Sequence, residues 1–314
     1  MDNLTHSFTG WVIGQAGLKV KSRKGLAALI LGANAPDIDV FTGAAAWAPL
    51  AMHRGFTHGL VGGLLVLPIA LTGLLWVFDR WQVGRGSGFR SGLEMKVGWL
   101  FALAFVGTLS HPLLDMLTTY SVQLLSPFSN AWYHADALFI IDVVLWTVLA
   151  LSIAWSRMRE RQGRPWRRVP QAVIAFSLAY IGLNLLITQQ AKAALIARLQ
   201  GPSPSAMFAS PQPVRFWQRK LVWRQERGIG QAFYDPLRGG LVSAGPHRRD
   251  NLDDPVVIAA ARDPQLKSFV GWSTMLVADV ERRGCQAIVT FGDARYTERA
   301  SRGSFSRQST VRTC

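Results

Sequence analysis

The stretch VGWLFALAFVGTLSHPLLDML, residues 97–117, decides what kind of fold this chain can adopt. It is apolar for long enough to cross a bilayer as a helix, which takes roughly 17–25 mostly apolar residues. Near its end it nevertheless carries His111 and Asp115. Ionisable side chains inside a membrane span are energetically costly and commonly functional. The stretch therefore predicts a membrane protein and marks one place where chemistry is expected.

The composition of the whole chain agrees with a membrane protein. Of its 314 residues, 49% are hydrophobic and 17% are charged, which is more apolar and less charged than usual for a soluble protein. The net charge of +15 would also suit a nucleic-acid-binding protein. Basic cytoplasmic loops and a basic extramembrane domain explain the same charge in a membrane protein. Because the sequence contains no base-reading motif, we expect no nucleic acid as a partner.

Three further segments, near 57–78, 138–156 and 170–188, are also long and apolar enough to span a bilayer. Two shorter apolar segments, 8–18 and 25–33, precede them. These could form a helical hairpin that enters the membrane partway, or helices completed by the polar residues beside them. The predicted fold class is therefore mainly α, a polytopic bundle of about four to six transmembrane helices.

The loops between these segments differ in charge, which predicts the orientation of the protein. Lysine and arginine are concentrated in 19–24, 79–96 and 157–169, whereas 42–56 and 118–137 carry almost none apart from one arginine. Basic loops of membrane proteins stay in the cytoplasm. The helices then alternate across the membrane, and residues 200–314 are expected outside the cytoplasm.

The last third of the chain differs in composition from the rest. It begins with the Pro/Ser-rich GPSPSAMFASPQP (201–213), and alternating runs such as VRFWQRKLVW (214–223) and QAIVTFGD (286–293) follow. Short alternating runs between turn residues are typical of β-strands. Cys285 and Cys314 could pair only if this end is exported, and the sequence leaves their pairing open. We predict a membrane domain at 1–190, a linker at 191–213, and an extracytoplasmic β-rich (α+β) domain with a mobile tail at 214–314.

Histidines and aspartates gather at the predicted extracytoplasmic ends of the helices. The orientation derived from loop charge puts nearly all of them on that side, although they lie far apart in the sequence. They are His6, Asp37, Asp39, His53, His58, His111, Asp115, His134, Asp136 and Asp142. This common side predicts one site rather than unrelated polar interruptions.

His111 and Asp115 form the pair with the clearest geometry. They are four residues apart, so on a helix they lie on one face and can reach a common ligand. Pro112 predicts a helix start or a kink at this point. The structural alternative is a plain hydrogen bond between the two side chains. In HRGFTH (53–58), by contrast, the two histidines are five apart and share no helical face, so we expect His53 on a loop and His58 at the start of a helix capped by Thr57.

The remaining candidates have structural explanations of equal standing. Asp37 and Asp39, considered alone, would be a solvated turn that ends a helix. Arg54 has a guanidinium suited to phosphate or carboxylate, and pairing with one of these aspartates would explain it equally well. His134 could simply be solvated, whereas Asp142 lies in the outer turn of a hydrophobic helix. We consider these last two as candidates for orienting the ligands of a site.

The combination of imidazoles and carboxylates indicates a divalent metal ion. We expect Zn²⁺, with Mn²⁺ or Fe²⁺ as alternatives, because Mg²⁺ and Ca²⁺ favour oxygen ligands. More candidate ligands are present than one ion needs, so one or two ions could be bound.

Five motifs in this order resemble the YdjM-like family of bacterial inner-membrane proteins, which are described as membrane-bound metal-dependent hydrolases. They are THSFTG (5–10), GANAPDID (32–39), HRGFTH (53–58), SHPLLDMLTTYSVQLLSPFS (110–129) and FIIDVVLW (139–146). The resemblance covers roughly residues 1–190. It implies a multi-helix membrane domain whose metal ligands would be His6, Asp37, Asp39, His53, His58, His111 and Asp115. The family is distantly similar to zinc-dependent phospholipase C enzymes, which implies a phosphoester substrate.

Our leading hypothesis is metal-assisted hydrolysis of a phosphoester, such as a phospholipid or another amphiphile, at the extracytoplasmic membrane face. Asp39 or Asp115 could act as general base and Arg54 could stabilise the developing charge. One alternative is a transporter or relay for protons or metal ions. Another is a non-catalytic membrane anchor that presents the C-terminal domain.

Overall fold

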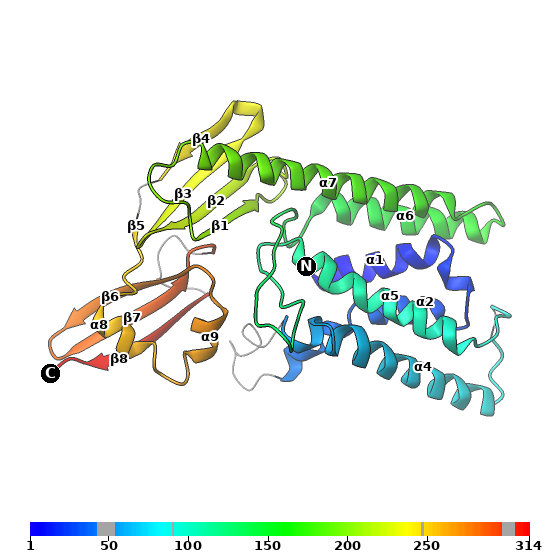
Figure 1. Cartoon of the computed structure of the whole chain (residues 1–314). Coiled ribbons are helices and arrows are strands. Elements are labelled where there is room, and N and C mark those ends of the chain that lie inside the picture. Colours follow the sequence, from blue (N-terminus) through cyan, green and yellow to red (C-terminus); the bar gives the residue numbers. More distant parts are fainter. Residues whose placement is uncertain (43–53, 90, 246–247, 297–304) are drawn as a thin grey trace. The chain divides into compact units, whose positions relative to one another are not determined.

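Figure 1 shows the computed structural model of the protein, which describes residues 1–42, 54–89, 91–245, 248–296 and 305–314. The chain forms two compact units. The first, which we call the helical unit, contains Met1–Asp39 and Arg54–Asn184, and the second contains Leu185–Cys314. The chain passes from one to the other within the long helix α7 (Arg168–Ile196).

Helices and short helical turns make up the helical unit. Its other helices are α1 (Asn3–Gln15), α2 (Gly25–Gly32), α4 (Leu67–Gly84), α5 (Val97–Met116) and α6 (Val143–Arg161), and the turns are η1 (Leu18–Val20), η2 (Ala35–Thr42), η3 (Phe56–His58) and η4 (Gly62–Val66). Two aspartates begin helices by accepting backbone N–H groups that the helix leaves unpaired. Asp2 does this for α1, and Asp142 for α6.

Three helical segments of the described chain are long and apolar enough to cross a membrane: Gly62–Gly84, Val97–Met116 and Arg168–Ile196. About four to six were predicted. The segment predicted at 138–156 is helical as α6, but it ends in the charged run SRMRER and falls outside these three. The helices α1 and α2 have 13 and 8 residues, and at about 1.5 Å per residue neither reaches the roughly 30 Å of a hydrocarbon core.

Two local expectations in these segments differ from the structure. Pro112 lies inside α5, which runs from Val97 to Met116, so it does not begin a helix; the alternative prediction, a kink, stays a prediction. Thr57 does not cap a helix at His58 either. The turn Phe56–His58 has Gly55 at its N-cap without a side-chain hydrogen bond, and the helix proper begins only at Leu67.

Glycines bring α2 and α5 into backbone contact. A Cβ atom on Gly107 would lie 2.7 Å from the Leu29 carbonyl oxygen, and one on Gly32 would lie 2.8 Å from the Ala104 oxygen. A Cβ atom on Gly10 of α1 would likewise lie 2.6 Å from the Leu29 carbonyl oxygen. Small residues allow helices in a membrane to approach this closely. As a result, the end of α2 lies directly beside the part of α5 that carries His111.

The basic loops lie together at one end of the helical unit. Arg23 donates two hydrogen bonds of 2.7 Å to Asp79 near the end of α4, and Lys19 pairs with Glu160 near the end of α6 at 2.5 Å. The Arg23 N–H also donates to the Glu94 carbonyl, at 2.9 Å, in the loop before α5. This grouping is the one that the loop charges predicted.

The second unit is rich in antiparallel strands, as predicted. Its first sheet contains β1 (Ala206–Pro211), β2 (Arg219–Gln225), β3 (Gly228–Asp235) and β4 (Gly240–Ala244) in that order, with β5 (Arg248–Arg249) also on β3. The second sheet is β6 (Leu276–Arg283), β7 (Gln286–Asp293) and β8 (Ser306–Arg312). A short turn, η5 (Pro236–Arg238), and the helices α8 (Pro255–Ala260) and α9 (Lys267–Trp272) complete the unit.

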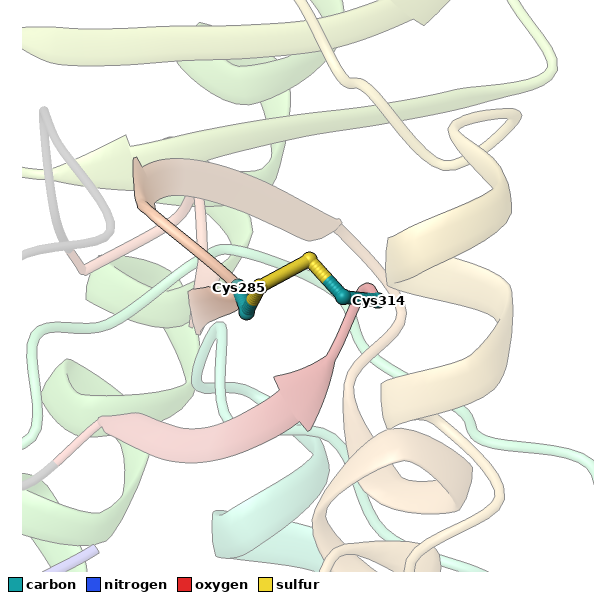
Figure 2. Close-up of a disulfide and its surroundings, with 2 residues drawn as sticks. All are labelled: Cys285 and Cys314. Carbon is teal, nitrogen blue, oxygen red and sulfur yellow. A yellow bond between two sulfur atoms is a disulfide. The ribbon is translucent and has the colours of Figure 1, made fainter.

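The second unit differs from the predicted boundaries at both ends. The segment 191–213, predicted as a linker, contains the end of α7 and the whole of β1. Ile187 and Leu195 of α7 pack with Leu221 of β2 in one hydrophobic core. At the other end, β8 pairs with β7 where a mobile tail was predicted. A disulfide joins Cys285, between β6 and β7, to Cys314 after β8, with a Cα–Cα distance of 5.1 Å (Figure 2).

Candidate metal centre

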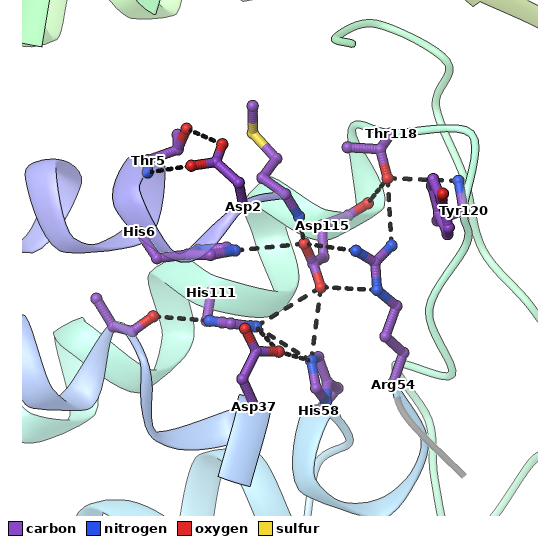
Figure 3. A network of polar contacts seen from close by, with 12 residues as sticks. Asp2, Thr5, His6, Asp37, Arg54, His58, His111, Asp115, Thr118 and Tyr120 are labelled. Atoms are coloured by element: carbon purple, nitrogen blue, oxygen red, sulfur yellow. Dashed lines mark hydrogen bonds and ion pairs between the residues drawn. The ribbon is translucent and has the colours of Figure 1, made fainter. Parts of the chain in front are cut away.

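Four side chains of the helical unit converge on one point. His111 and Asp115 project from the last turns of α5, His58 ends the turn η3, and Asp37 lies in η2 just after α2. One donor atom from each lies within 4.8 Å of the donor atoms of the other three, and His58, His111 and Asp115 are fully buried. Figure 3 shows these side chains pointing toward one another. We call them the four-residue group.

The distances within this group are short and similar. His111 Nε2 lies 3.1 Å from His58 Nε2 and 3.1 Å from Asp37 Oδ1. His58 Nε2 lies 3.4 Å from Asp37 Oδ1 and 3.5 Å from Asp115 Oδ2, and His111 Nε2 lies 3.6 Å from Asp115 Oδ2. All five distances join atoms that can carry lone pairs.

The partner of His111 on its other ring nitrogen assigns its tautomer. His111 Nδ1 lies 2.7 Å from the carbonyl oxygen of Ala33, the residue that follows α2. A carbonyl oxygen can only accept, so the proton of a neutral ring lies on Nδ1 and the lone pair on Nε2. The Nε2 lone pair then faces the other three side chains.

Thr57 assigns the tautomer of His58 in the same way. Its hydroxyl lies 2.6 Å from Asp39 Oδ2, to which it donates its proton, and 3.1 Å from His58 Nδ1. Because that hydroxyl proton is used on Asp39, the Thr57 oxygen must accept from His58 Nδ1–H. In their neutral forms, both histidines therefore turn unprotonated Nε2 atoms toward each other. A partner that holds the far nitrogen of a histidine in this way is typical of metal ligands.

Asp115 is held from the opposite side by Arg54. Arg54 Nη2 donates to Asp115 Oδ1 at 3.3 Å and Nε lies 3.1 Å from Oδ2. Arg54 also donates to the Thr118 hydroxyl at 3.3 Å, and its guanidinium lies 5.0 Å from the centre of the Tyr120 ring. The amino group of Met1 contacts Asp115 as well. The backbone of Arg54 has a φ of 68°, a left-handed conformation that residues other than glycine rarely adopt.

His6 lies on the other face of His111. The two rings stack with centroids 3.7 Å apart and planes 15° apart, and His6 Nε2 lies 3.4 Å from Asp115 Oδ1. Neither ring nitrogen of this buried histidine makes a hydrogen bond within the described chain. His6 therefore adjoins the four-residue group without being one of its members.

The donor set fits a metal ion. Asp115 Oδ2 is buried and accepts no hydrogen bond within the described residues, although it points at both Nε2 atoms. Lone pairs this close repel one another unless a cation or a proton lies between them. In tetrahedral zinc sites with ligand bonds of about 2.0–2.1 Å, neighbouring ligand atoms lie about 3.3–3.4 Å apart. The five distances given above, from 3.1 to 3.6 Å, bracket that spacing, while the group as a whole lies within 4.8 Å.

The other predicted residues lie in different surroundings. His53 lies outside the described residues. His134 Nδ1 lies 2.9 Å from Asp136 Oδ1. Asp142 accepts hydrogen bonds from the Leu145 N–H and the Tyr180 hydroxyl, each at 3.0 Å, so its contacts are those of a helix cap.

Sequence reasoning missed the groups that orient the two histidines. Thr57 was expected to cap a helix, and the Ala33 carbonyl carries no signal because every residue has one. The motif PDID–HRGFTH could have suggested a contact between Asp39 and the hydroxyl next to His58. Thr118 and Tyr120, which contact Arg54, were also not singled out.

Apolar helices of membrane-spanning length and a buried group of two histidines and two aspartates define a membrane protein that could hold a metal ion. The family model described as YdjM inner membrane protein matches residues 1–191. The inner membrane protein YbcI of Escherichia coli (strain K12) is 39% identical over 137 residues, which cover 42% of this chain and 70% of that protein. No solved structure matches the chain. The chain belongs to the YdjM inner membrane protein family, and its place is the inner membrane.

Proposed function

We propose that the protein is a membrane-bound metal-dependent hydrolase that cleaves a phosphoester at the extracytoplasmic face of the inner membrane. The observation that carries this proposal is the convergence of two histidine nitrogens and two carboxylates, whose donor atoms all lie within 4.8 Å of one another. Zn²⁺ suits this donor set best, with Mn²⁺ or Fe²⁺ as alternatives. A bound ion supplies polarisation of a phosphoryl oxygen and a more acidic water.

The residues of the chain have separate tasks in this proposal. Asp37, His58, His111 and Asp115 would hold the ion. Thr57, backed by Asp39, keeps the His58 ring in the ligating orientation. A carboxylate oxygen of the group that does not ligate would accept the proton of the attacking water.

Arg54 is suited to stabilise negative charge. Its guanidinium is held in place by Asp115, Thr118 and Tyr120, so little reorganisation is needed when charge develops on a phosphoryl oxygen. Its left-handed backbone also supports a functional role, because such conformations cluster at functional sites.

Exposed apolar residues around the group support an amphiphilic substrate. Ile38 lies between Asp37 and Asp39, and Phe56 and Leu60 flank His58; all three are exposed. Phe128, 78% exposed, lies on the loop that packs against Gly59, where an added Cβ would be 2.5 Å from the Ser126 oxygen. An acyl chain could rest on this apolar rim while its phosphate reaches the polar group, so we propose a phospholipid-type substrate.

The topology in this proposal follows from loop charge. Basic loops at one end of the helical unit place that end in the cytoplasm, so the four-residue group and the C-terminal domain would lie outside. This requires α6 to cross the membrane in addition to the three apolar segments. The Cys285–Cys314 disulfide supports the export of the C-terminal domain, since disulfides persist in oxidising compartments.

The test is hydrolysis by the purified full-length protein in mixed micelles of phospholipid and detergent. We expect release of a phosphorylated headgroup or phosphate, loss of the activity on metal removal, and recovery on addition of Zn²⁺, Mn²⁺ or Fe²⁺. His58→Ala and His111→Ala should be inactive while retaining the helical circular-dichroism spectrum. Bound metal in wild type without hydrolysis of any phosphoester offered, together with metal flux into liposomes, would instead favour a transporter.

A further inference from the structure

An open pocket with a mixed polar and apolar lining lies at the basic end of the helical unit. It has a volume of about 620 Å³ and lies between the end of α6 and the start of α7. Its lining includes Arg164, Trp166, Arg167 and Arg168 and one carboxylate, that of Glu160. None of these residues belongs to the four-residue group or contacts it.

The charges that line this cavity are not balanced. Both carboxylate oxygens of Glu160 are engaged by Lys19 Nζ, at 2.5 and 2.6 Å. Arg164, Arg167 and Arg168 form no ion pair with any residue that the structure describes. The pocket therefore presents three exposed guanidinium groups that are available to an anion from outside the chain.

Hydrogen bonds hold the loop that forms the cavity. The Ser156 hydroxyl donates to the Trp166 carbonyl at 3.0 Å, and Arg159 Nε donates to the Pro165 carbonyl at 2.8 Å. The Arg164 N–H donates to the Arg159 carbonyl at 2.9 Å. The three arginines are thus carried by a loop with a defined shape.

Aromatic and apolar groups adjoin the charged lining. The Trp166 ring lies 4.6 Å from Lys19 Nζ and 5.1 Å from the Arg167 guanidinium. On the adjoining turns of α6, Trp155 and Met158 are 54% and 51% exposed. Tryptophan is enriched where a membrane meets water, and exposed apolar side chains on α6, which crosses the membrane in the proposed topology, suit contact with acyl chains.

We propose that this cavity binds the phosphate of an anionic phospholipid headgroup, with the acyl chains along α6. Guanidinium groups match phosphate oxygens with paired hydrogen bonds, and basic pockets between membrane helices are known to take such headgroups. This site is independent of the proposed hydrolase activity. A free phosphate ion carries the same chemistry, so the experiment separates the two sources.

The test compares two triple variants of the full-length protein. Arg164→Gln/Arg167→Gln/Arg168→Gln removes the three cavity charges. Lys21→Gln/Arg80→Gln/Arg85→Gln removes three charges from the same basic end but outside the cavity. Because the change in net charge is equal, general attraction to an anionic membrane would weaken to the same extent in both. Only a site at the cavity separates them.

Retention of lipid after purification is measured by native mass spectrometry, with phosphatidylglycerol and phosphatidylcholine as probes. We expect the cavity variant to retain phosphatidylglycerol at least about tenfold less than wild type, since three basic side chains that each contribute several-fold to binding are removed. The control variant should stay within about twofold, and phosphatidylcholine should be unaffected in both. If the cavity triple does not fold, Arg164→Gln/Arg168→Gln keeps Arg167 on Trp166 and should show a smaller loss.

Equal loss in the two triple variants, or no loss in the cavity variant, would overturn the proposal. A third arm adds excess inorganic phosphate without lipid and follows the melting temperature. Stabilisation by phosphate that depends on the cavity arginines, without selective retention of phosphatidylglycerol, would assign the site to the free ion and so also refute the lipid proposal.

Discussion

Thr57→Val tests whether the side-chain network around His58 orients it as a metal ligand. The Thr57 hydroxyl donates to Asp39 at 2.6 Å and accepts from His58 Nδ1 at 3.1 Å. Valine has nearly the same shape but offers neither contact. Without the hydroxyl, the nearest carboxylate oxygen, Asp39 Oδ2, lies 3.6 Å from His58 Nδ1, beyond hydrogen-bond distance. The ring then loses both its tautomer preference and its orientation.

The expected loss follows from the role of such partners in metal sites. Removing a group that orients a ligating histidine typically weakens metal binding by about 10- to 100-fold, which corresponds to about 1.4–2.7 kcal/mol. The four donor atoms themselves remain, so binding should be weakened rather than abolished. The fold should be retained because valine is close to threonine in volume and Thr57 is only partly buried.

The assay is competition for Zn²⁺ between the detergent-solubilised protein and a coloured chelator. Thr72→Val is the matched control, because Thr72 is a buried threonine of the same unit whose hydroxyl donates to the Pro68 carbonyl at 2.6 Å, within α4. It should bind zinc as wild type does. A zinc affinity of Thr57→Val within about twofold of wild type, with the fold intact, would refute the assigned roles of Thr57 and His58.

Three further predictions concern other parts of the protein. Asp115→Asn and Asp79→Asn each break a buried aspartate–arginine pair. Elemental analysis should nevertheless show that only Asp115→Asn loses its bound metal. Equal loss of metal from both variants would mean that the carboxylate of Asp115 is not a ligand. Burial raises the pKa of Asp293, but the positive charge of Arg295 and the hydrogen bonds to the carboxylate lower it by more, so the pKa lies below its ordinary value. The ionised carboxylate therefore stabilises the fold above a pH of about 4. This contribution to stability falls as the pH drops below about 4. Thermal unfolding from pH 7 to pH 3 should therefore show a steeper loss in wild type than in Asp293→Asn, and parallel curves would contradict it. Replacing the cysteine pair 285/314, 29 residues apart, by serine should lower the stability of the second unit by about 3–4 kcal/mol by chain entropy, as measured by urea unfolding, whereas an unchanged midpoint would show that the bond adds nothing.

Much of the candidate site could be predicted from the sequence because its residues are polar while the segments around them are apolar. His58, His111 and Asp115 lie in or next to apolar segments, where an ionisable side chain is energetically costly and commonly functional. The spacing of the last two also predicted that they share a helical face, as they do in α5. Asp37 carried a weaker signal, since an aspartate after a proline usually marks a turn, and only its place among the histidines made it a candidate.

The roles of neighbouring residues could not be predicted in the same way. Asp37 and Asp39 are separated by one residue, yet Asp37 contacts His111 and Asp39 contacts Thr57. Asp142 was considered for orienting a ligand but caps α6. Each of these side chains has several chemically reasonable partners, and the choice between them depends on backbone direction in the turns, which no periodic pattern records.

The sequence by itself determined that this is a membrane protein with a helical N-terminal part, a strand-rich C-terminal part, and basic loops at one end. These properties follow from apolar length, alternation and charge, which are local to each segment. Only the tertiary structure decided which donor atoms meet. That meeting depends on the backbone contact of α2 with α5 at Gly32 and Gly107, which places the Ala33 carbonyl 2.7 Å from His111 Nδ1 and so turns its Nε2 toward His58. A contact of this kind joins residues far apart in the sequence, and its geometry arises only when the helices pack.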